Sequence, residues 1–263
     1  GKMCCLSNAS VLVRYGETTV LVNVTASKKP REGIDFFPLS VDFEEKLYAI
    51  GKIPGSFLKR EGRPSQKAIL ASRLVDRPIR PLFPKYMRND VSVVMTVLSV
   101  DPDCSPEIAG MIGTSFALSI SDIPWNGPIS GVALGLVDGK VVICPDEEQR
   151  KVSDMAVTVA GSKDKIVMIE AGANQVPEDV MLDAIAQGHE EIKKMVDFIA
   201  GVQAEIGKEK FTFESMEVDH DFFEKIKEFA EERVKEALDT DDKNERDARL
   251  APIVEDIHAK FDE

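Results

Sequence analysis

The sequence predicts an α+β core followed by an all-α segment, and three observations lead to this fold class. Alternating apolar runs, which are typical of β-strands, recur through the first two thirds of the chain. Patterns typical of helices lie between these runs. After Gly207 only highly charged, helix-forming stretches follow. This order indicates an α+β core over 1–212 and an all-α segment over 213–263, with the boundary near Phe213.

The composition is that of an ordinary globular protein. The 263 residues weigh 29.0 kDa, which fits one large domain or two modest ones, and 43% are hydrophobic and 30% charged, which excludes a disordered or collagen-like chain. No apolar run approaches the roughly 18 residues of a membrane span, and the first six residues are too short for a secretory leader. We therefore expect a cytoplasmic protein without a membrane partner, and four cysteines that are small buried residues.

Alternating apolar and β-branched residues predict the strands. The clearest signal is a pair of such runs separated by a short turn, as Asp138-Gly139 separates the halves of 129–143. Pro38 favours a sheet edge or a bend. The expected strands are, in order, a hairpin over 11–24, strands over 36–39 and 41–43, a buried strand over 91–100, the hairpin over 129–143 and a hairpin over 155–169.

Capping residues and prolines mark the expected helix ends. A loop over 51–65 is rich in glycine and proline, and Ser65 at its end can cap a helix that Pro78 is expected to stop near Arg77. Ser105 begins a helix with apolar or small residues on both faces, which indicates a central position. The expected helices are, in order, 65–77, 105–120, 177–199, 221–238 and 242–261.

The charge is divided unevenly along the chain. A net charge of −13 by itself argues against a nucleic-acid partner. Residues 52–88, however, contain ten basic and two acidic residues, a net of +8. Such a concentration attracts phosphates locally, because distant charges are screened beyond about 10 Å. Charge alone leaves two interpretations open, an anion site and a solvated face of ion pairs.

The predicted core contains no complete set of catalytic residues. All three histidines lie at or beyond His189, so a Ser-His-Asp or Cys-His arrangement inside the core is not expected. The histidines also lack the spacing of a helical zinc pair. The residues therefore point to binding rather than to catalysis.

Basic residues gather beside an aromatic residue in the loop over 51–65. Lys59, Arg60 and Arg63 lie close to Phe57 in the sequence. Cations contact phosphates and an aromatic ring stacks on bases, so this combination can hold a nucleic-acid strand. We predict that these four residues form a binding site for such a strand.

Three arginines follow on one face of the predicted helix. Arg73, Arg77 and Arg80 have the i, i+4, i+7 spacing of one helical face. Guanidinium groups this close need neutralising partners, and Asp76 can serve only one of them. A bound phosphate, which arginine grips through two parallel hydrogen bonds, would serve the others. The alternative is that Arg73 pairs with Asp76 and that the helix only borders the core.

The same residues carry a resemblance to the polynucleotide phosphorylase family. The run 53–65 resembles that family's RNA-gripping loop, in which Phe-Phe-Arg-Arg stands where this chain has Phe57-Leu58-Lys59-Arg60. The run 73–84 resembles the family's arginine segment, and 35–39 and 127–129 also fit. The similarity extends from about Ser10 to Phe213, and the helices beyond resemble the family's linker domain.

The resemblance implies a ribonuclease PH-like α+β core, of the ribosomal protein S5 domain 2-like type, followed by a truncated all-α segment. It implies a nucleotidyltransferase that shortens single-stranded RNA from the 3′ end by phosphorolysis, releasing nucleoside diphosphates, and that can extend RNA in reverse. The whole protein would be a homotrimer whose subunits each have two cores, then KH and S1 modules. Lys59, Arg60 and Arg63 would hold the RNA backbone, Phe57 would stack on a base, and Arg73, Arg77 and Arg80 would approach phosphates near the active site.

The chain departs from the family plan where phosphate and metal bind. In the family, the phosphate-binding serines and the Mg²⁺ ligands belong to a second core, which this chain does not reach. The matching places here read Cys104-Ser105-Pro106 and, over 153–158, Ser-Asp-Met-Ala-Val-Thr, so that Ala156 and Thr158 replace an acid and a lysine. The resemblance therefore implies an N-terminal fragment that binds RNA without cutting it and holds no Mg²⁺ itself. Leu58 weakens stacking, and Lys59 loses the two-pronged geometry of arginine.

Two other functions stay open. The first is a non-catalytic ring subunit, like the inactive partners in exosome rings, that serves RNA binding and assembly. The second is an enzyme of a phosphorylated metabolite, for which Phe57 would have no role. Salt-dependent binding to RNA oligomers, with an affinity that grows with length, separates these two.

Overall fold

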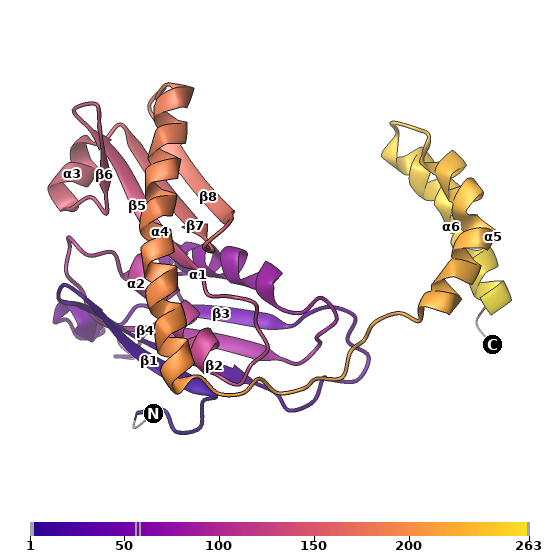
Figure 1. The fold of residues 1–263 in the computed structure, drawn as a ribbon, viewed down its shortest axis with the longest axis horizontal. Coiled ribbons are helices and arrows are strands. Elements are labelled where there is room, and N and C mark those ends of the chain that lie inside the picture. The colour runs from indigo at the N-terminus through magenta and orange to yellow at the C-terminus, as the bar shows by residue number, and fades with distance from the viewer. Residues whose placement is uncertain (1–2, 56, 58, 262–263) are drawn as a thin grey trace. The chain divides into compact units, whose positions relative to one another are not determined.

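The computed structural model describes residues 3–55, 57 and 59–261 (Figure 1). The chain divides into two compact units, Gly1–Ser215 and Met216–Glu263. The first unit contains two four-stranded sheets with helices packed on them, and the second unit contains two helices. The mixed α+β class of the first unit and the all-α class of the second are as the sequence predicts.

The first sheet has the strand order β1-β2-β4-β3. Its strands are β1 (Ala9–Tyr15), β2 (Thr18–Ala26), β3 (Leu39–Glu44) and β4 (Val91–Ser99). β1, β2 and β4 pair antiparallel, and β3 lies parallel to β4 with Leu39 opposite Val91. Every second residue along most of β2 and β4 is buried, because alternate side chains of a strand point to the same face. This face contributes the valines of the larger core.

The second sheet has the order β6-β5-β7-β8 and is antiparallel throughout. Its strands are β5 (Ser130–Val137), β6 (Lys140–Ile143), β7 (Met155–Gly161) and β8 (Ile166–Ala173). Asp138 and Gly139, between β5 and β6, have φ angles of 49° and 70°. Positive φ at both central residues is what the tightest hairpin turns require, so the predicted hairpin is confirmed together with its turn.

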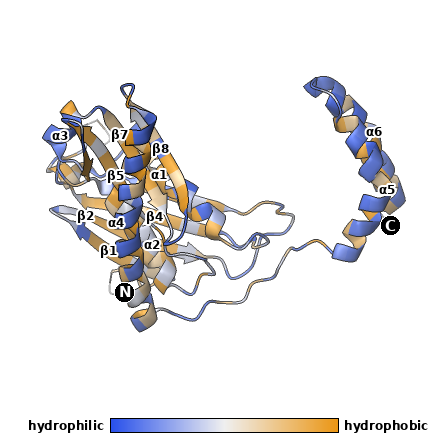
Figure 2. Cartoon of the chain, turned by 45° about the horizontal axis from the view of Figure 1, so that its top comes forward, coloured by the Kyte–Doolittle hydropathy of each residue, from blue (hydrophilic) through white to orange (hydrophobic). Residues whose placement is uncertain are grey.

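Three helices cover the sheets. α1 (Gln66–Ile79) and α2 (Pro106–Ile120) pack with the first sheet, and α4 (Glu178–Ile206) runs along the second sheet and past α2 (Figure 1). Glycine lets α2 approach the first sheet closely, because a β-carbon at Gly113 would lie 2.7 Å from Val22 Cγ2. Ser105 caps α2, whose residues are mostly buried, as predicted. Figure 2 shows hydrophobic strands and a hydrophilic outer side of α4.

The helix α1 does not stop before Pro78, contrary to the sequence expectation. It continues to Ile79 and passes into the short 3₁₀ helix η2 (Arg80–Leu82). Pro78 lies in the last turn, where its missing N–H removes only one helical hydrogen bond. Pro78 and Ile79 are both buried, and this burial favours the helical path.

Other differences are local. Phe36 and Phe37, expected in a strand, precede β3, and Phe37 instead packs on Phe83 with ring centroids 4.8 Å apart. α4 extends beyond the expected end near Ile199. The sequence patterns did not indicate the 3₁₀ helix η1 (Leu47–Ile50) or the short helix α3 (Glu147–Val152). The cysteines are free, and three are half-buried and Cys5 exposed, so the expectation that all four are buried was wrong.

The second unit is a pair of helices, α5 (His220–Leu238) and α6 (Lys243–Phe261). Ala230, Ala237 and Ile253 form its small core. Asp219 caps α5 by accepting a hydrogen bond from the backbone N–H of Phe222 at 3.0 Å. Among the described helices of both units, none has the length and apolar character needed to cross a membrane.

Candidate nucleic-acid interface

The loop between η1 and α1 exposes the residues predicted to bind a nucleic acid. The Phe57 side chain is fully exposed, at 100%, and Lys59, Arg60 and Arg63 are exposed as well. None of these three cations forms an ion pair or a hydrogen bond with another described residue. Leu58, at which the family has a second phenylalanine, lies outside the described residues. The loop thus presents the aromatic ring of Phe57 and these three unneutralised cations to solvent, together with the exposed Lys52 at its start.

Hydrogen bonds of Glu61 and Ser65 hold the C-terminal part of the loop in place. Its acidic residue, Glu61, accepts a hydrogen bond from the backbone N–H of Leu47 at 2.9 Å. Ser65 accepts from the N–H of Ala68 at 3.0 Å, which caps α1, and donates to Glu45 at 2.6 Å. Glu61 therefore serves the backbone of η1 and forms no ion pair with the cations beside it among the described residues.

The guanidinium group of Arg80 already has a carboxylate partner. Its Nη2 and Nε atoms donate to the two oxygens of Asp76 at 2.8 and 2.9 Å. It also donates to the carbonyl oxygens of Phe37 at 3.4 Å and Leu39 at 3.1 Å. Arg80 therefore joins the end of α1 to the chain that enters β3, and the alternative pairing of Arg73 with Asp76 is not found.

Arg77 is also paired, whereas Arg73 is not. Arg77 Nη1 donates to Glu170 of β8 at 2.8 Å. Arg73 is exposed and forms no ion pair or hydrogen bond with a described residue. The expected array of three guanidinium groups awaiting phosphate is therefore reduced to one free group, because tertiary structure supplies carboxylates to the other two.

A cleft of about 1450 Å³ lies beside the loop. Residues from η1, the first turns of α1, the start of α2 and strands β5 and β7 line it. Its described lining includes eight carboxylates against five cations, which are Lys46, Arg63, Lys67, Arg73 and Arg150. The cleft itself is therefore acidic, in contrast to the cationic loop at its edge.

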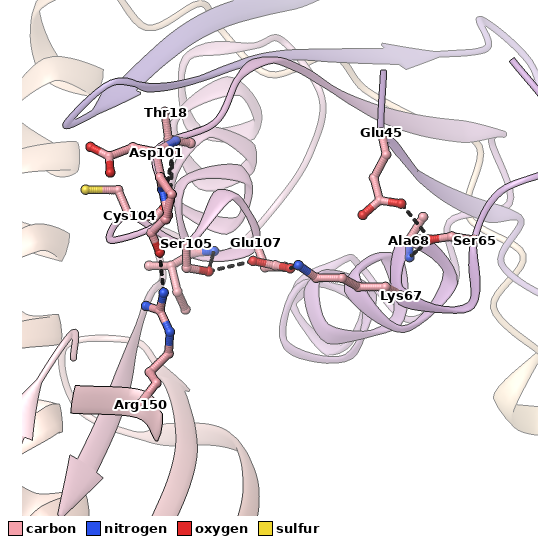
Figure 3. A network of polar contacts seen from close by, with 12 residues as sticks. Thr18, Glu45, Ser65, Lys67, Ala68, Asp101, Cys104, Ser105, Glu107 and Arg150 are labelled. Atoms are coloured by element: carbon pink, nitrogen blue, oxygen red, sulfur yellow. Dashed lines mark hydrogen bonds and ion pairs between the residues drawn. The ribbon is translucent and has the colours of Figure 1, made fainter. Parts of the chain in front are cut away.

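At the start of α2, a carboxylate occupies the end of the helix that faces the cleft (Figure 3). Glu107 accepts a hydrogen bond from Ser105 Oγ at 2.7 Å and pairs with Lys67 Nζ at 3.2 Å. Burial disfavours its ionised form, but the hydrogen bonds from Ser105 and from its own backbone N–H, together with Lys67, outweigh burial and hold the pKa of Glu107 below its usual range. Sequence reasoning found the helix start here but assigned no role to Glu107.

A second polar cluster fixes another part of the cleft wall. Arg150 donates to the carbonyl oxygen of Pro145 at 2.7 Å and to that of Pro102, and thereby joins two loops. Tyr15 lies at the same wall, and burial, reinforced by the neighbouring thiol of Cys144, raises its pKa to about 12. Arg150, which the sequence did not single out, is thus a structural residue of the cleft.

The residues at the family's metal positions do not form a metal site in the described chain. Asp154 stands at the first acid of the family's motif, Ala156 replaces the second acid, and Thr158 replaces the lysine. Over residues 3–55, 57 and 59–261, no group of three or more His, Cys, Asp or Glu side chains is placed to hold a metal ion.

Three protein-family models match the chain. Residues 6–124 match "3′ exoribonuclease family, domain 1", and residues 127–191 match "3′ exoribonuclease family, domain 2". Residues 221–263 match "Polyribonucleotide nucleotidyltransferase, RNA binding domain". The first two models cover both sheets of the first unit, and the third covers most of the second unit.

Curated relatives of high identity share the name polyribonucleotide nucleotidyltransferase. The protein of Ruminiclostridium cellulolyticum is 62% identical over 263 residues, and that of Clostridioides difficile is 57% identical over 262 residues. Each alignment covers 100% of this chain but only 37% of the relative. The chain therefore spans little more than a third of the length of these proteins.

Solved structures agree in fold. A chain of the Archaeoglobus fulgidus exosome with RNA bound to the active site has a TM-score of 0.58 and is 20% identical in sequence. The matched region covers 73% of this chain and 83% of the exosome chain. Rice (Oryza sativa) Rrp46 has a TM-score of 0.60 and is 15% identical in sequence, and the matched region covers 75% of this chain and 89% of the rice protein. At this level of identity the likeness concerns the fold alone.

Proposed function

The chain belongs to the 3′ exoribonuclease family, and it corresponds to the N-terminal 37% of polyribonucleotide nucleotidyltransferases. From this membership we propose that the chain is the RNA-binding, catalytically incomplete part of such an enzyme. The whole protein would remove nucleotides from the 3′ end of RNA by phosphorolysis and release nucleoside diphosphates. This part would hold single-stranded RNA without cutting it.

The exposed loop is the observation that carries the proposal. Phe57 is fully exposed, and Lys59, Arg60 and Arg63 have no partner among the described residues. A side chain as large and apolar as phenylalanine gains nothing from full exposure in the free protein. A base stacked on the ring and phosphates beside the cations would account for both features.

The charge pattern favours the loop over the cleft as the place where RNA binds. Carboxylates outnumber cations in the described lining of the cleft, so the cleft as a whole attracts a polyanion less than the loop does; Arg63 and Arg73 belong both to this lining and to the residues predicted to contact RNA. The loop cations stand in solvent, where a strand can reach them without desolvating buried acids. Arg73 is the arginine of α1 that could add a phosphate contact, since Arg77 and Arg80 have carboxylate partners.

The chemistry would need parts that this chain does not supply. The described residues offer no metal ligand set, so Mg²⁺ would belong to a second core elsewhere in the whole protein. Inorganic phosphate or nucleoside diphosphates as partners, the homotrimer and the cytoplasmic location stay predictions for the whole protein. No step attributed to this chain depends on them.

The alternative of a non-catalytic ring subunit is less supported. The exosome chains resemble this chain at 20% and 15% identity, which speaks for a shared fold only. The polyribonucleotide nucleotidyltransferases resemble it at 57% to 62% over its whole length. The second alternative, an enzyme of a phosphorylated metabolite, finds no support in these relatives and leaves Phe57 without a role.

Binding of a fluorescently labelled single-stranded RNA oligomer tests the proposal. The test variant replaces Lys59, Arg60 and Arg63 by alanine. Its matched control replaces three exposed lysines elsewhere in the first unit, Lys28, Lys140 and Lys165, by alanine, so that both variants lose the same charge. We expect the loop variant to lose affinity about tenfold or more at low salt, and its log–log salt slope to fall by about 2, or roughly 0.7 per lost phosphate contact.

Two outcomes would contradict the proposal. Equal losses of affinity in the loop variant and in the control would mean that RNA senses only the net charge. Release of nucleoside diphosphates by the unaltered chain, mixed with RNA, phosphate and magnesium, would contradict the division between binding here and cutting elsewhere.

A further inference from the structure

Two cysteines from separate segments of the first unit lie around one tyrosine. Cys104 stands just before α2, and Cys144 directly follows β6. Tyr15, the last residue of β1, shares a side-chain hydrogen bond with Cys144. The next residue, Gly16, lies against the other thiol, because a β-carbon on this glycine would be 2.6 Å from Cys104 Sγ. The two thiols therefore flank the turn that follows β1.

Hydrogen bonds hold the two cysteine-bearing segments together. Arg150 of α3 donates to the carbonyl oxygen of Pro145 at 2.7 Å and to that of Pro102. Pro145 directly follows Cys144, and Pro102 lies two residues before Cys104. A backbone N–H at the start of α3 also donates, at 3.0 Å, to the carboxylate of the residue before Cys104. Figure 3 shows Arg150 pointing toward the segment that carries Cys104.

The surroundings of the two thiols differ. Both thiols are free and half-buried. Burial, then the carboxylates of Asp101 and Asp103 and the sulfur of Cys144, raise the pKa of the Cys104 thiol, so Cys104 keeps its proton. Cys144 belongs to the lining of the cleft, where a small solute can reach it. Cys144 is therefore placed to meet an oxidant first, with Cys104 as the second thiol beside it.

We propose that Cys104 and Cys144 form a reversible disulfide when the protein meets a peroxide. Hydrogen peroxide oxidises the Cys144 thiol to a sulfenic acid and leaves one water. The sulfur of Cys104 then attacks the sulfenic sulfur, the S–S bond forms, and the sulfenic hydroxyl leaves with the proton of Cys104 as a second water. Two thiols and one peroxide thus give one disulfide and two waters. Two molecules of a small thiol reverse the step and become a disulfide themselves.

The bond joins parts of the first unit that belong to different sheets. Cys104 precedes α2, which packs with the first sheet, and Cys144 follows β6 of the second sheet. Pro102, Pro145 and Arg150 between them line the cleft, so the disulfide fixes this cleft wall covalently. The loop cations lie on another segment, so the proposal goes beyond the proposed function and does not depend on RNA binding.

Peptide mapping without reduction tests the proposal. The whole chain is treated with equimolar hydrogen peroxide, its remaining thiols are alkylated, and it is cut with trypsin. Cleavage after lysine and arginine places the two cysteines in separate peptides, 89–140 and 141–150. We expect these peptides as one linked pair, lighter than their sum by two hydrogen atoms, and their separation after dithiothreitol. Peroxide-treated chains in which the two peptides stay unlinked would overturn the proposal.

Cysteine variants distinguish this pair from the other thiols. Cys4→Ser with Cys5→Ser removes the two remaining cysteines, and this double variant should form the same linked peptides at the same rate. Cys104→Ser lacks the second thiol, so the sulfenic acid of Cys144 should persist and react with dimedone. Disulfides that contain Cys4 or Cys5 in place of the expected pair would contradict the assignment.

Two variants of α3 test whether Arg150 positions the thiols. Arg150→Met and Lys151→Met each remove one cation of this helix. Lys151 pairs with Glu147 and Glu148 of its own helix, whereas Arg150 holds the cysteine-bearing segments. We expect Arg150→Met to form the disulfide several-fold more slowly and Lys151→Met to form it at the unaltered rate. Equal rates in these variants would contradict the juxtaposition from which the proposal is argued.

The fold of each variant can be checked independently. The fluorescence of Trp125, the single tryptophan, reports on the packing of the first unit, because its indole N–H donates to the carbonyl oxygen of Ile79 inside the core. A parallel RNA titration of the reduced chain tests the proposed function by itself. RNA binding by a chain that forms no link between Cys104 and Cys144 would overturn this inference and leave the proposed function standing.

Discussion

The ammonium group of Lys210 lies 2.6 Å from the carbonyl oxygen of Ser121, to which it donates a hydrogen bond. It also donates to the carbonyls of Leu118 at 2.9 Å and Ser119 at 3.0 Å. Carbonyls at the C-terminal end of a helix lack partners within the helix, and a cation there also opposes the negative end of the helix dipole. Lys210, which follows α4, thus closes the end of α2 from a distant part of the chain.

Replacing Lys210 by methionine should lower the free energy of unfolding of the first unit by about 1–3 kcal/mol, because three carbonyls lose a charged donor. Urea unfolding followed by Trp125 fluorescence measures the effect. Lys140→Met, at an exposed position of β6, is the control and should change stability by less than about 0.5 kcal/mol. Equal effects of the two variants would show that the hydrogen bonds of Lys210 do not stabilise the C-terminal end of α2.

The stability of the first unit should depend on pH through Glu107. Its pKa in the folded chain lies below the ordinary value of 4.5, so the unfolded chain binds the proton more readily. The stabilisation is therefore fully present above pH 4.5 and is lost as the pH falls through the lower, folded value. We expect Glu107→Gln to be less stable than the unaltered chain at neutral pH by about 1 kcal/mol.

The same difference should shrink in acid. Unfolding midpoints of the two proteins should converge as the pH is lowered well below 4.5, since both side chains are then neutral. A stability difference that stays constant across this range would mean that the ionisation of Glu107 is not linked to folding.

Arg80 and Arg73 should separate structure from binding. Arg80→Lys loses the two-pronged contact with Asp76 and should cost about 1 kcal/mol of stability, with little change in RNA affinity. Arg73→Ala should lower RNA affinity several-fold. The unfolding midpoint should stay unchanged, because the Arg73 side chain forms no ion pair or hydrogen bond with a described residue. The reverse pattern would show that the paired arginine is the one that meets RNA.

Replacing Phe57 by alanine should weaken binding of single-stranded RNA by about 1–3 kcal/mol, the value of one stacked base. The unfolding midpoint should not change, since the ring is fully exposed and packs on no core residue. Leu182→Ala, at an exposed position of α4, is the control. A salt slope equal to that of the unaltered chain would identify the loss as stacking rather than charge.

Much of the fold was predictable because local sequence encodes local structure. The turn at Asp138-Gly139 and the cap at Ser105 each depend on the conformational preferences of a few adjacent residues, and both were found. Pro78 misled the helix boundary, since the burial of Pro78 and Ile79 in the tertiary core outweighs the local preference against continuing the helix. The exposed loop position of Phe57, Lys59, Arg60 and Arg63 was predictable because loop composition and charge are local as well; their role in binding stays a prediction.

By itself the sequence determined the α+β class, the family and the exposed cationic loop, since each follows from the types and order of neighbouring residues. Only the tertiary structure decided which cations are free. Glu170, which neutralises Arg77, lies 93 positions from it in the sequence. The carbonyl oxygen of Ser121, which accepts a hydrogen bond from Lys210, lies 89 positions from that lysine. Such partners meet because strands and helices pack in three dimensions, and no pattern within a short stretch of sequence specifies them.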